Sequence, residues 1–139
     1  MPLSPGPRHR HDGWAKSTVF EQFGVTATEV YSFLTYYQAT TPRRYVDEGY
    51  NYENSYCYHS PFPGWSTDRC IFAVLDLTGP DDVAVKVDAR FSHLVATYSQ
   101  SSRFRAVKSG DWNYSCTIYD GTLPPFWDHE CKGGRSAAY

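Results

Sequence analysis

The sequence is poor in the aliphatic residues that usually fill a protein core. Its 139 residues include six Leu, two Ile and ten Val, against twelve Tyr, eight Phe and four Trp. A chain of this length is enough for one domain and too short for two ordinary ones. We therefore expect a single domain whose core is largely aromatic.

The chain also lacks a marked excess of charge of one sign. Thirteen basic and fifteen acidic residues give a formal net charge of −2, which provides no global field to attract nucleic acid or an anionic membrane. No apolar run approaches the roughly 18 residues needed to span a bilayer. Residues 1–7 lack the apolar segment of a signal peptide, so if the protein is secreted we expect its signal to have been removed. The sequence predicts neither a nucleic-acid partner nor a membrane span.

Motifs of familiar catalytic chemistry are missing as well. The sequence contains no Gly-x-Ser-x-Gly, no His-Glu-x-x-His and no Gly-rich phosphate loop. His9, His11 and Asp12 form one short polar tract, which offers too few fixed ligands for a metal ion. We expect no catalytic activity, no metal and no cofactor. The alternative is a small secreted hydrolase or ribonuclease in which His59 and His93 share acid and base catalysis.

Four cysteines are present, and they form two close pairs along the chain: Cys57 with Cys70, and Cys116 with Cys131. An even count without Cys-x-x-Cys or a suitably spaced His is typical of disulfides rather than of zinc or redox sites. Of the three pairings, we favour the sequential one, because a short loop inside a hairpin closes with little rearrangement. Each such loop would contribute roughly 3 kcal/mol in the chain-entropy model. Disulfides would place the protein in a secreted, extracellular setting.

After a polar start, the hydrophobic pattern alternates with a period of two, which is typical of strands with one buried face. The clearest run, 83–91, alternates apolar residues with Ala, Lys, Asp and Arg, and a Gly-Pro turn at 78–82 joins it to the strand 71–77. Further strands are predicted over 17–23, 29–38, 49–59, 93–99, 103–108 and 111–119. Seven or eight short strands indicate an all-β fold, an antiparallel β-barrel or β-sandwich with two disulfides, and we favour the barrel.

The β domain is predicted to occupy residues 14–132. Residues 1–13 are rich in Pro, Gly and basic side chains, and we expect them to form a flexible N-terminal arm. Residues 133–139 are expected to form a C-terminal tail.

One face of the predicted strand 49–59 is made of tyrosines: Tyr50, Tyr52, Tyr56 and Tyr58. The opposite face is polar, with Asn51, Glu53, Ser55, Cys57 and His59. Because of that polar face, we expect the tyrosines to pack into the core. The alternative is an exposed aromatic platform for a sugar ring or a protein surface.

Each cysteine pair brackets a loop that combines Pro, Phe and Trp. Pro restricts the unfolded chain, and aromatic rings on loops held by a rigid scaffold often carry binding energy. We expect the binding site to include Trp65, Trp127, Phe62, Phe126 and Tyr58, with a host protein, a small ligand or a carbohydrate as partner. The alternative is that each Trp caps its own loop and shields the disulfide.

Arg103 and Arg105 share one face of the predicted strand 103–108. They could contact an anion or a nucleic-acid backbone, but two or three charges on a strand are usually its solvated side, and the acidic net charge gives no support. We therefore expect no nucleic-acid site there. Asn113-Tyr114-Ser115 is an N-glycosylation sequon, which is consistent with secretion.

In the order of these features, the chain resembles the small secreted fungal β-barrel proteins typified by the major Alternaria allergen, a group that includes elicitors of plant cell death. The resemblance consists of an early strand ending in aromatics, a strand leading into Cys57, the loop to Cys70, a central hairpin over 72–91, and the late pair Cys116 and Cys131. It implies a secreted, non-enzymatic fungal effector or elicitor that binds a partner in a host plant and triggers or modulates plant defence.

The resemblance also bears on the oligomeric state. Members like the allergen carry an additional N-terminal cysteine that forms a covalent dimer, whereas no cysteine precedes Cys57 here. We expect a monomer or a non-covalent dimer. A carbohydrate-binding module that uses exposed Tyr and Trp rings is an alternative to the effector function.

Overall fold

The computed structural model describes residues 8–39, 53–75, 82–107 and 110–136, and strands make up most of them. Eight strands lie in these ranges: β1 (Arg8–Phe20), β2 (Thr26–Ala39), β3 (Tyr56–His59), β4 (Ser66–Leu75), β5 (Asp82–His93), β6 (Ala96–Val107), β7 (Trp112–Tyr119) and β8 (Asp128–Arg135). A single 3-10 turn, Gln22–Gly24, joins β1 to β2. The all-β prediction is confirmed.

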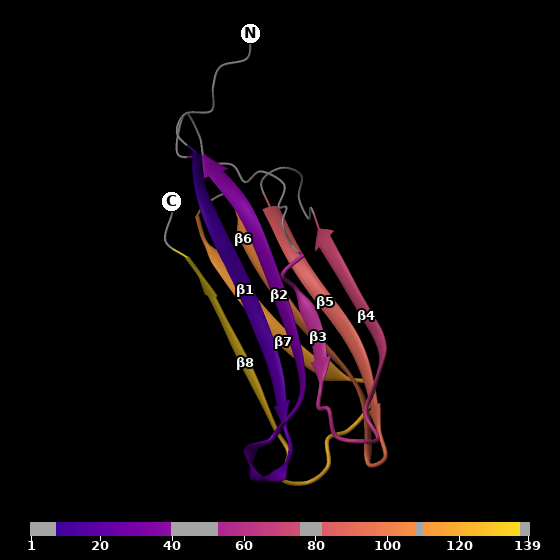
Figure 1. The fold of residues 1–139 in the computed structure, drawn as a ribbon. Helices are drawn as coiled ribbons and strands as arrows, with labels where there is room; N and C mark the ends of the chain where they lie inside the picture. The colour runs from indigo at the N-terminus through magenta and orange to yellow at the C-terminus, as the bar shows by residue number, and fades with distance from the viewer. Residues whose placement is uncertain (1–7, 40–52, 76–81, 108–109, 137–139) are drawn as a thin grey trace.

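The strands form two antiparallel sheets that pack face to face (Figure 1). Sheet A has the strand order β3-β2-β1-β8, and sheet B has the order β4-β5-β6-β7. The described strands therefore form a sandwich of two separate four-stranded sheets rather than one continuously hydrogen-bonded barrel. The connections β1–β2, β3–β4, β5–β6 and β7–β8 all lie at one end of the sandwich, which we call the loop end.

The sandwich is closed at both edges by disulfides. Cys57 on β3 bonds Cys70 on β4, and Cys116 on β7 bonds Cys131 on β8, with Cα–Cα distances of 6.1 and 5.7 Å. The sequential pairing is confirmed, but its expected reason is wrong, because each bond joins two sheets instead of closing a hairpin. Two disulfides and no free cysteine indicate an oxidising environment.

The first strand begins earlier than the sequence pattern predicts. β1 starts at Arg8, which pairs with Ala39 of β2, so residues 8–13 belong to the sheet and not to a flexible arm. Backbone pairing needs no apolar alternation, and His11 adds a stacked contact with Tyr36 at 5.3 Å. Residues 1–7 of the predicted arm lie outside the described residues.

The last strand escaped prediction altogether. β8 runs from Asp128 to Arg135, so the predicted tail 133–139 begins inside a strand. Its polar sequence and two glycines are unfavourable for a strand, but pairing with β1 and the bond at Cys131 hold it in place. Packing requires glycine at 133, because a Cβ there would lie 2.2 Å from the Tyr114 ring.

The core lies between the two sheets and is aromatic to a large extent. The largest fully buried side chains include Tyr36, Tyr98, Phe91 and Phe104, which agrees with the scarcity of Leu and Ile. Two clusters of buried residues fill the interior, one around Phe91 and Tyr98 and the other around Tyr36 and Phe104.

Removing either disulfide is expected to destabilise the sandwich strongly. The double variants Cys57→Ser/Cys70→Ser and Cys116→Ser/Cys131→Ser should each lower the free energy of unfolding by about 3 kcal/mol, because the freed chain segments gain entropy in the unfolded state. Urea unfolding of the two variants and the unaltered protein measures the loss. Thiol titration of the unreduced protein is the control and should find no reactive thiol. Two losses below about 1 kcal/mol would contradict the role of the disulfides as sheet-to-sheet ties.

Candidate functional site

On β3 the tyrosines point outward and their polar neighbours point inward, the reverse of the predicted arrangement. Tyr56 and Tyr58 are 38% and 41% exposed, whereas Ser55 is buried. The reason is covalent: Cys57 must point towards sheet B to bond Cys70, so strand alternation turns both neighbouring tyrosines outward. The prediction that they pack into the core is therefore wrong. Tyr50 and Tyr52 lie outside the described residues.

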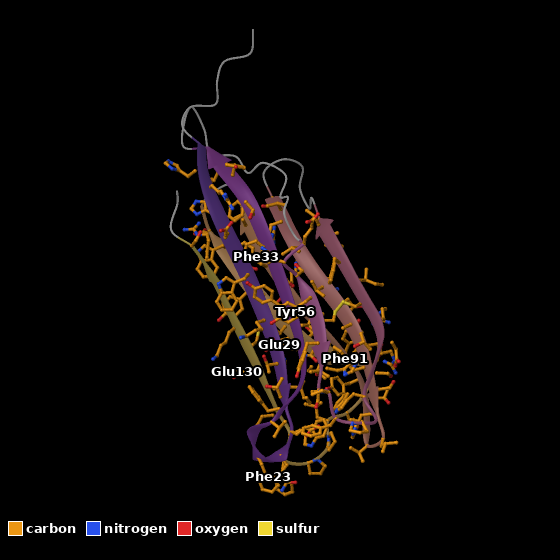
Figure 2. The ribbon with its side chains drawn as sticks, in the orientation of Figure 1. Phe23, Glu29, Phe33, Tyr56, Phe91 and Glu130 are labelled. Carbon is orange, nitrogen blue, oxygen red and sulfur yellow. A yellow bond between two sulfur atoms is a disulfide. The ribbon has the colours of Figure 1, made fainter. Side chains whose placement is uncertain are left out.

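Tyr56 belongs to a group of rings on the outer surface of sheet A that we call the aromatic face: Trp14 of β1, Tyr31 and Phe33 of β2, and Tyr56 of β3. Tyr31 lies at its centre, with its ring centroid 5.2 Å from Tyr56, 6.2 Å from Trp14 and 6.3 Å from Phe33. The interplanar angles are only 22°, 27° and 21°. In Figure 2 the labelled Phe33 and Tyr56 lie along the same side of the sheet.

Strand register produces this arrangement. Trp14 pairs with Phe33 and Tyr31 pairs with Tyr56, so the four side chains occupy adjacent positions on one pleated surface. The position of the Trp14 ring also depends on Gly134, its partner on β8, which has no side chain. A Cβ at Gly134 would lie 3.0 Å from Trp14 Nε1. The rings of β1 and β2 were missed from the sequence. The sequence does contain a sign of these rings: the strand 26–39 carries large side chains on both of its faces, so one set must point away from the core.

Polar groups border the aromatic face. The Glu29 carboxylate accepts hydrogen bonds from Thr18 Oγ1, at 3.2 Å, and from the Tyr56 hydroxyl, while Lys16 pairs with Tyr31 across the strands. Burial, and then the hydrogen bond to Glu29, raise the pKa of Tyr56, which keeps its hydroxyl protonated as a donor. The surface thus combines near-parallel rings with a carboxylate and an ammonium group, a combination suited to a ligand with one apolar flat side and polar edges.

The structure separates the five residues predicted from the loops into two groups. Trp65 is only 8% exposed and stacks on His93 at 4.5 Å, with Trp127, which is half-buried, 6.0 Å away. Trp65 therefore has little surface to offer a partner, and its burial favours the alternative that it caps its own loop. Phe62 and Phe126 are 62% and 79% exposed and, like Tyr58, are accessible to a partner.

The loop end carries further exposed apolar side chains. Phe23, Leu94 and Val95 stand on other connections at the same end of the sandwich, and Phe23 is 93% exposed (Figure 2). Phe23 and Phe126 have φ angles of 74° and 70°, a left-handed conformation that costs roughly 1–2 kcal/mol for a residue with a side chain. The chain thus displays two phenyl rings at positions where glycine would be less strained.

The two histidines of the hydrolase alternative have separate surroundings. His59 donates from Nδ1 to the Ser60 carbonyl at 2.7 Å, whereas His93 packs against Trp65 and Trp127. Within the described ranges, no hydrogen bond or ring contact joins the two imidazoles. The arrangement gives the hydrolase alternative no support.

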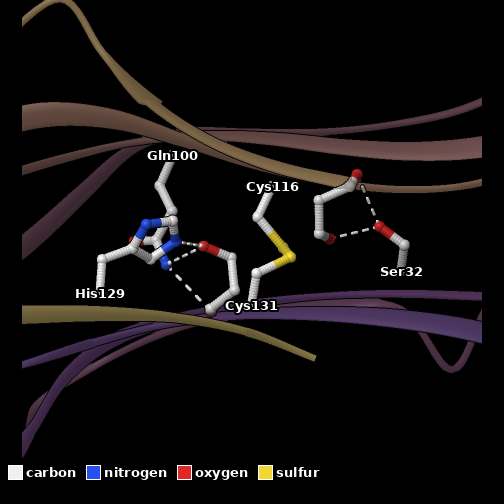
Figure 3. Close-up of a disulfide and its surroundings, with 7 residues drawn as sticks. Ser32, Gln100, Cys116, His129 and Cys131 are labelled. Atoms are coloured by element: carbon white, nitrogen blue, oxygen red, sulfur yellow. Dashed lines mark hydrogen bonds between the residues drawn. A yellow bond between two sulfur atoms is a disulfide. The ribbon is translucent and has the colours of Figure 1, made fainter. Parts of the chain in front are cut away.

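A different Ser–His pair joins the buried Ser17 of β1 to His129, an exposed residue of the outer strand β8 (Figure 3). Ser17 Oγ is 2.8 Å from His129 Nε2, the distance of a nucleophile and its base. Ser17 is nevertheless fully buried, and its Oγ already accepts a hydrogen bond from Gln100 Nε2 at 3.0 Å. Gln100 Oε1 in turn accepts from Thr28 at 2.6 Å. No substrate can reach Ser17, so these residues serve to hydrogen-bond one sheet to the other.

Known proteins provide no guide to this site. A comparison with protein-family models, with curated proteins and with solved structures found no match for the chain. In the part of the chain that the structure describes, no three His, Cys, Asp or Glu side chains gather where they could hold a metal ion. Helices long and apolar enough to cross a membrane are also absent from the described residues.

Two histidines predict a loss of stability in acid. Burial first of all lowers the pKa of His11, which is a buried residue, and partial desolvation of the ring lowers the pKa of His129, which stands on the outer strand β8, so between the folded and unfolded pKa values the unfolded chain binds more protons. Stability should be intact above about pH 6.5 and fall as the pH drops below it. Urea unfolding across pH 4.5–8 should show a shallower slope for His11→Gln/His129→Gln. A slope equal to that of the unaltered protein would contradict this assignment.

Proposed function

We propose that this protein is a secreted, non-catalytic binding module that holds carbohydrate on the aromatic face. The observation that carries the proposal is the set of near-parallel rings of Trp14, Tyr31, Phe33 and Tyr56 on the outer surface of sheet A. Tyr56 is exposed and Trp14, Tyr31 and Phe33 are half-buried, so part of this aromatic group stays open at the surface, where a ligand can contact it.

Sugar chemistry matches this surface better than a general apolar partner does. The C–H groups on one face of a pyranose ring carry partial positive charge and pack on the negative π faces of aromatic rings. The hydroxyls at the ring edge need donors and acceptors, and Glu29, Lys16 and the Tyr56 hydroxyl lie beside the rings. Several rings in one surface favour a chain of sugar units over a single unit.

The scaffold supports a fixed binding geometry. The four rings stand on paired strands rather than on loops, and a preorganised surface loses little entropy when a ligand binds. Secretion is supported by the two disulfides, which are typical of small extracellular domains.

Removing single rings should weaken sugar binding. Tyr31→Ala and Tyr56→Ala should each lower affinity about two- to tenfold, since one aromatic contact contributes roughly 0.5–1.5 kcal/mol. Pull-down on insoluble cellulose, chitin, xylan and β-1,3-glucan identifies the glycan, and calorimetry with its oligosaccharides measures the affinity. Phe62→Ala is the control, because it removes an exposed ring at the loop end, away from the aromatic face. Absence of binding to all four glycans, or an equal loss in the control, would contradict the proposal.

The exposed rings at the loop end favour a second candidate function. We propose that an effector or elicitor activity, as implied by the resemblance to the fungal allergen group, uses Phe62 and Phe126 to contact a host protein. Both rings are accessible, and loops held by a rigid scaffold commonly carry recognition.

Leaf infiltration tests this second candidate. The purified protein should cause cell death or a defence response in leaves, and Phe62→Asn/Phe126→Asn should abolish it; asparagine tolerates the left-handed backbone of residue 126. Ile71→Asn, at an exposed position on sheet B, is the control and should leave the response unchanged. No response in several plant species would count against the elicitor activity and leave the sugar-binding proposal intact.

A further inference from the structure

The outer surface of sheet B, which lies opposite the aromatic face, is rich in positive charge. Alternation along β4, β5 and β6 directs five cationic side chains to it and two carboxylates: Arg69, Lys86, Arg90, Arg103 and Arg105, with Asp82 and Asp88. Asp68, at the bulge of β4, adds a third carboxylate, which accepts a hydrogen bond from Ser92 on this face. A local excess of cations in a chain with a net charge of −2 needs an explanation.

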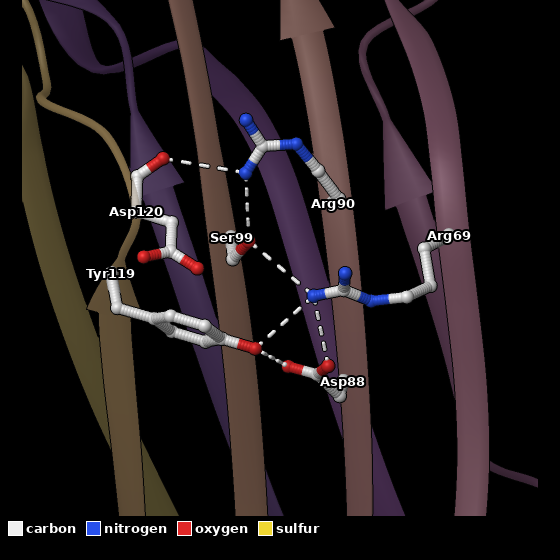
Figure 4. A network of polar contacts seen from close by, with 6 residues as sticks. All are labelled: Arg69, Asp88, Arg90, Ser99, Tyr119 and Asp120. Atoms are coloured by element: carbon white, nitrogen blue, oxygen red, sulfur yellow. Dashed lines mark hydrogen bonds and ion pairs between the residues drawn. The ribbon is translucent and has the colours of Figure 1, made fainter.

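The three carboxylates already have partners. Asp68 accepts hydrogen bonds from the hydroxyls of Ser66 and Ser92. Arg69 pairs with Asp88 at 2.9 Å, and Arg105 pairs with Asp82 at 2.6 Å. Figure 4 shows that Tyr119 also donates to Asp88, and that Arg90 donates to the Ser99 hydroxyl at 3.0 Å and the Asp120 carbonyl at 3.3 Å. Arg90 also lies near the Asp68 carboxylate, whose pKa is lowered by hydrogen bonds from Ser92 and Ser66 and by the charge of Arg90. Lys86 and Arg103 are the two cations of this face that remain.

Lys86 and Arg103 lie directly opposite each other in the β5–β6 ladder. Like charges in directly opposed positions destabilise a sheet, and among the described residues no carboxylate pairs with either side chain. Arg103 Nε is buried without a hydrogen-bond partner. The sheet therefore keeps a repulsive pair that an anion placed between the two side chains would relieve.

Hydroxyl groups on β7 lie next to the Lys86 and Arg103 pair on the same outer surface. Ser115 of β7 pairs with Arg103 and is exposed, and Thr117, also exposed, lies two positions along on the same face. We call Lys86, Arg103 and Ser115 the basic row. It offers an ammonium group, a guanidinium group and a hydroxyl, all donors to the oxygens of a carboxylate or sulfate.

We propose that the basic row binds the acidic groups of an anionic polysaccharide, of the carboxylate or sulfate type. Single-stranded nucleic acid is a poorer fit, because successive bases stack on several aromatic rings, and among the described outward positions of β4–β7 only Tyr119 is aromatic. A repeating polymer also suits a small site, since neighbouring acidic groups rebind before the chain leaves. The basic row differs in residues and in face from the aromatic face, so this inference does not depend on the sugar-stacking proposal.

Immobilised polymers test the basic row. The protein should be retained by heparin, a sulfated chain, or by polygalacturonate, a carboxylate chain, and whichever retains it identifies the acidic group. Neutral dextran should not retain it. Lys86→Gln and Arg103→Gln should each weaken retention at least about threefold, and retention should fall with added salt. Because each change removes the like-charge contact, both variants should also melt at a slightly higher temperature, which separates this result from loss by unfolding.

Matched variants make the result decisive. Lys132→Gln removes an exposed cation that is paired with Glu130 on sheet A, and it should leave retention unchanged. Tyr56→Ala should also retain full binding to the acidic polymer, which separates this site from the aromatic face. Retention that is equal for Lys86→Gln/Arg103→Gln and the unaltered protein, or binding to oligo(dT) as tight as to both acidic polymers, would overturn the proposal.

Discussion

The structure depends on the two covalent links between its sheets. A chain with six Leu and two Ile has little aliphatic surface to bury, and each sheet has only four strands. In a sandwich of this size the outer strands are the weakest parts, because one side of each has no strand partner. Both disulfides join outer strands of the two sheets: β3 to β4, and β7 to β8. Cross-linking therefore acts where hydrogen bonding and packing contribute least.

The same links determine which side chains face outward. Because a strand alternates with a strict period of two, an inward cysteine fixes the orientation of every residue near it. On β3 the inward Cys57 places Tyr56 next to Tyr31 on the outside. On β8 the inward Cys131 lets Gly134 lie beneath Trp14. The disulfides that stabilise the sandwich thus also fix which side chains form the aromatic face.

Period-two alternation and cysteine spacing were enough to predict the fold class, the disulfide pairing and the central strand 83–91. They could not predict segments whose structure depends on pairing with strands that are distant in the sequence. β8 is polar and contains two glycines, and only its pairing with β1 and its disulfide make it a strand. The tyrosines of β3 were assigned inward because their neighbours are polar, a rule that cannot include a cysteine bonded across the interior. Trp14 and Tyr31 became part of one site through register, which composition does not reveal.

The buried hydrogen bonds between the sheets have a consequence for how the molecule is aligned. Apolar contacts permit two sheets to slide over one another with small changes in energy, whereas Gln100 bonded to both Thr28 and Ser17, and Ser32 bonded to Ser102, permit one offset only. These buried hydrogen bonds therefore fix the alignment of the two sheets. Any feature on the outside of sheet A keeps a constant position relative to any feature on the outside of sheet B, and the protein presents its two surfaces as one rigid body.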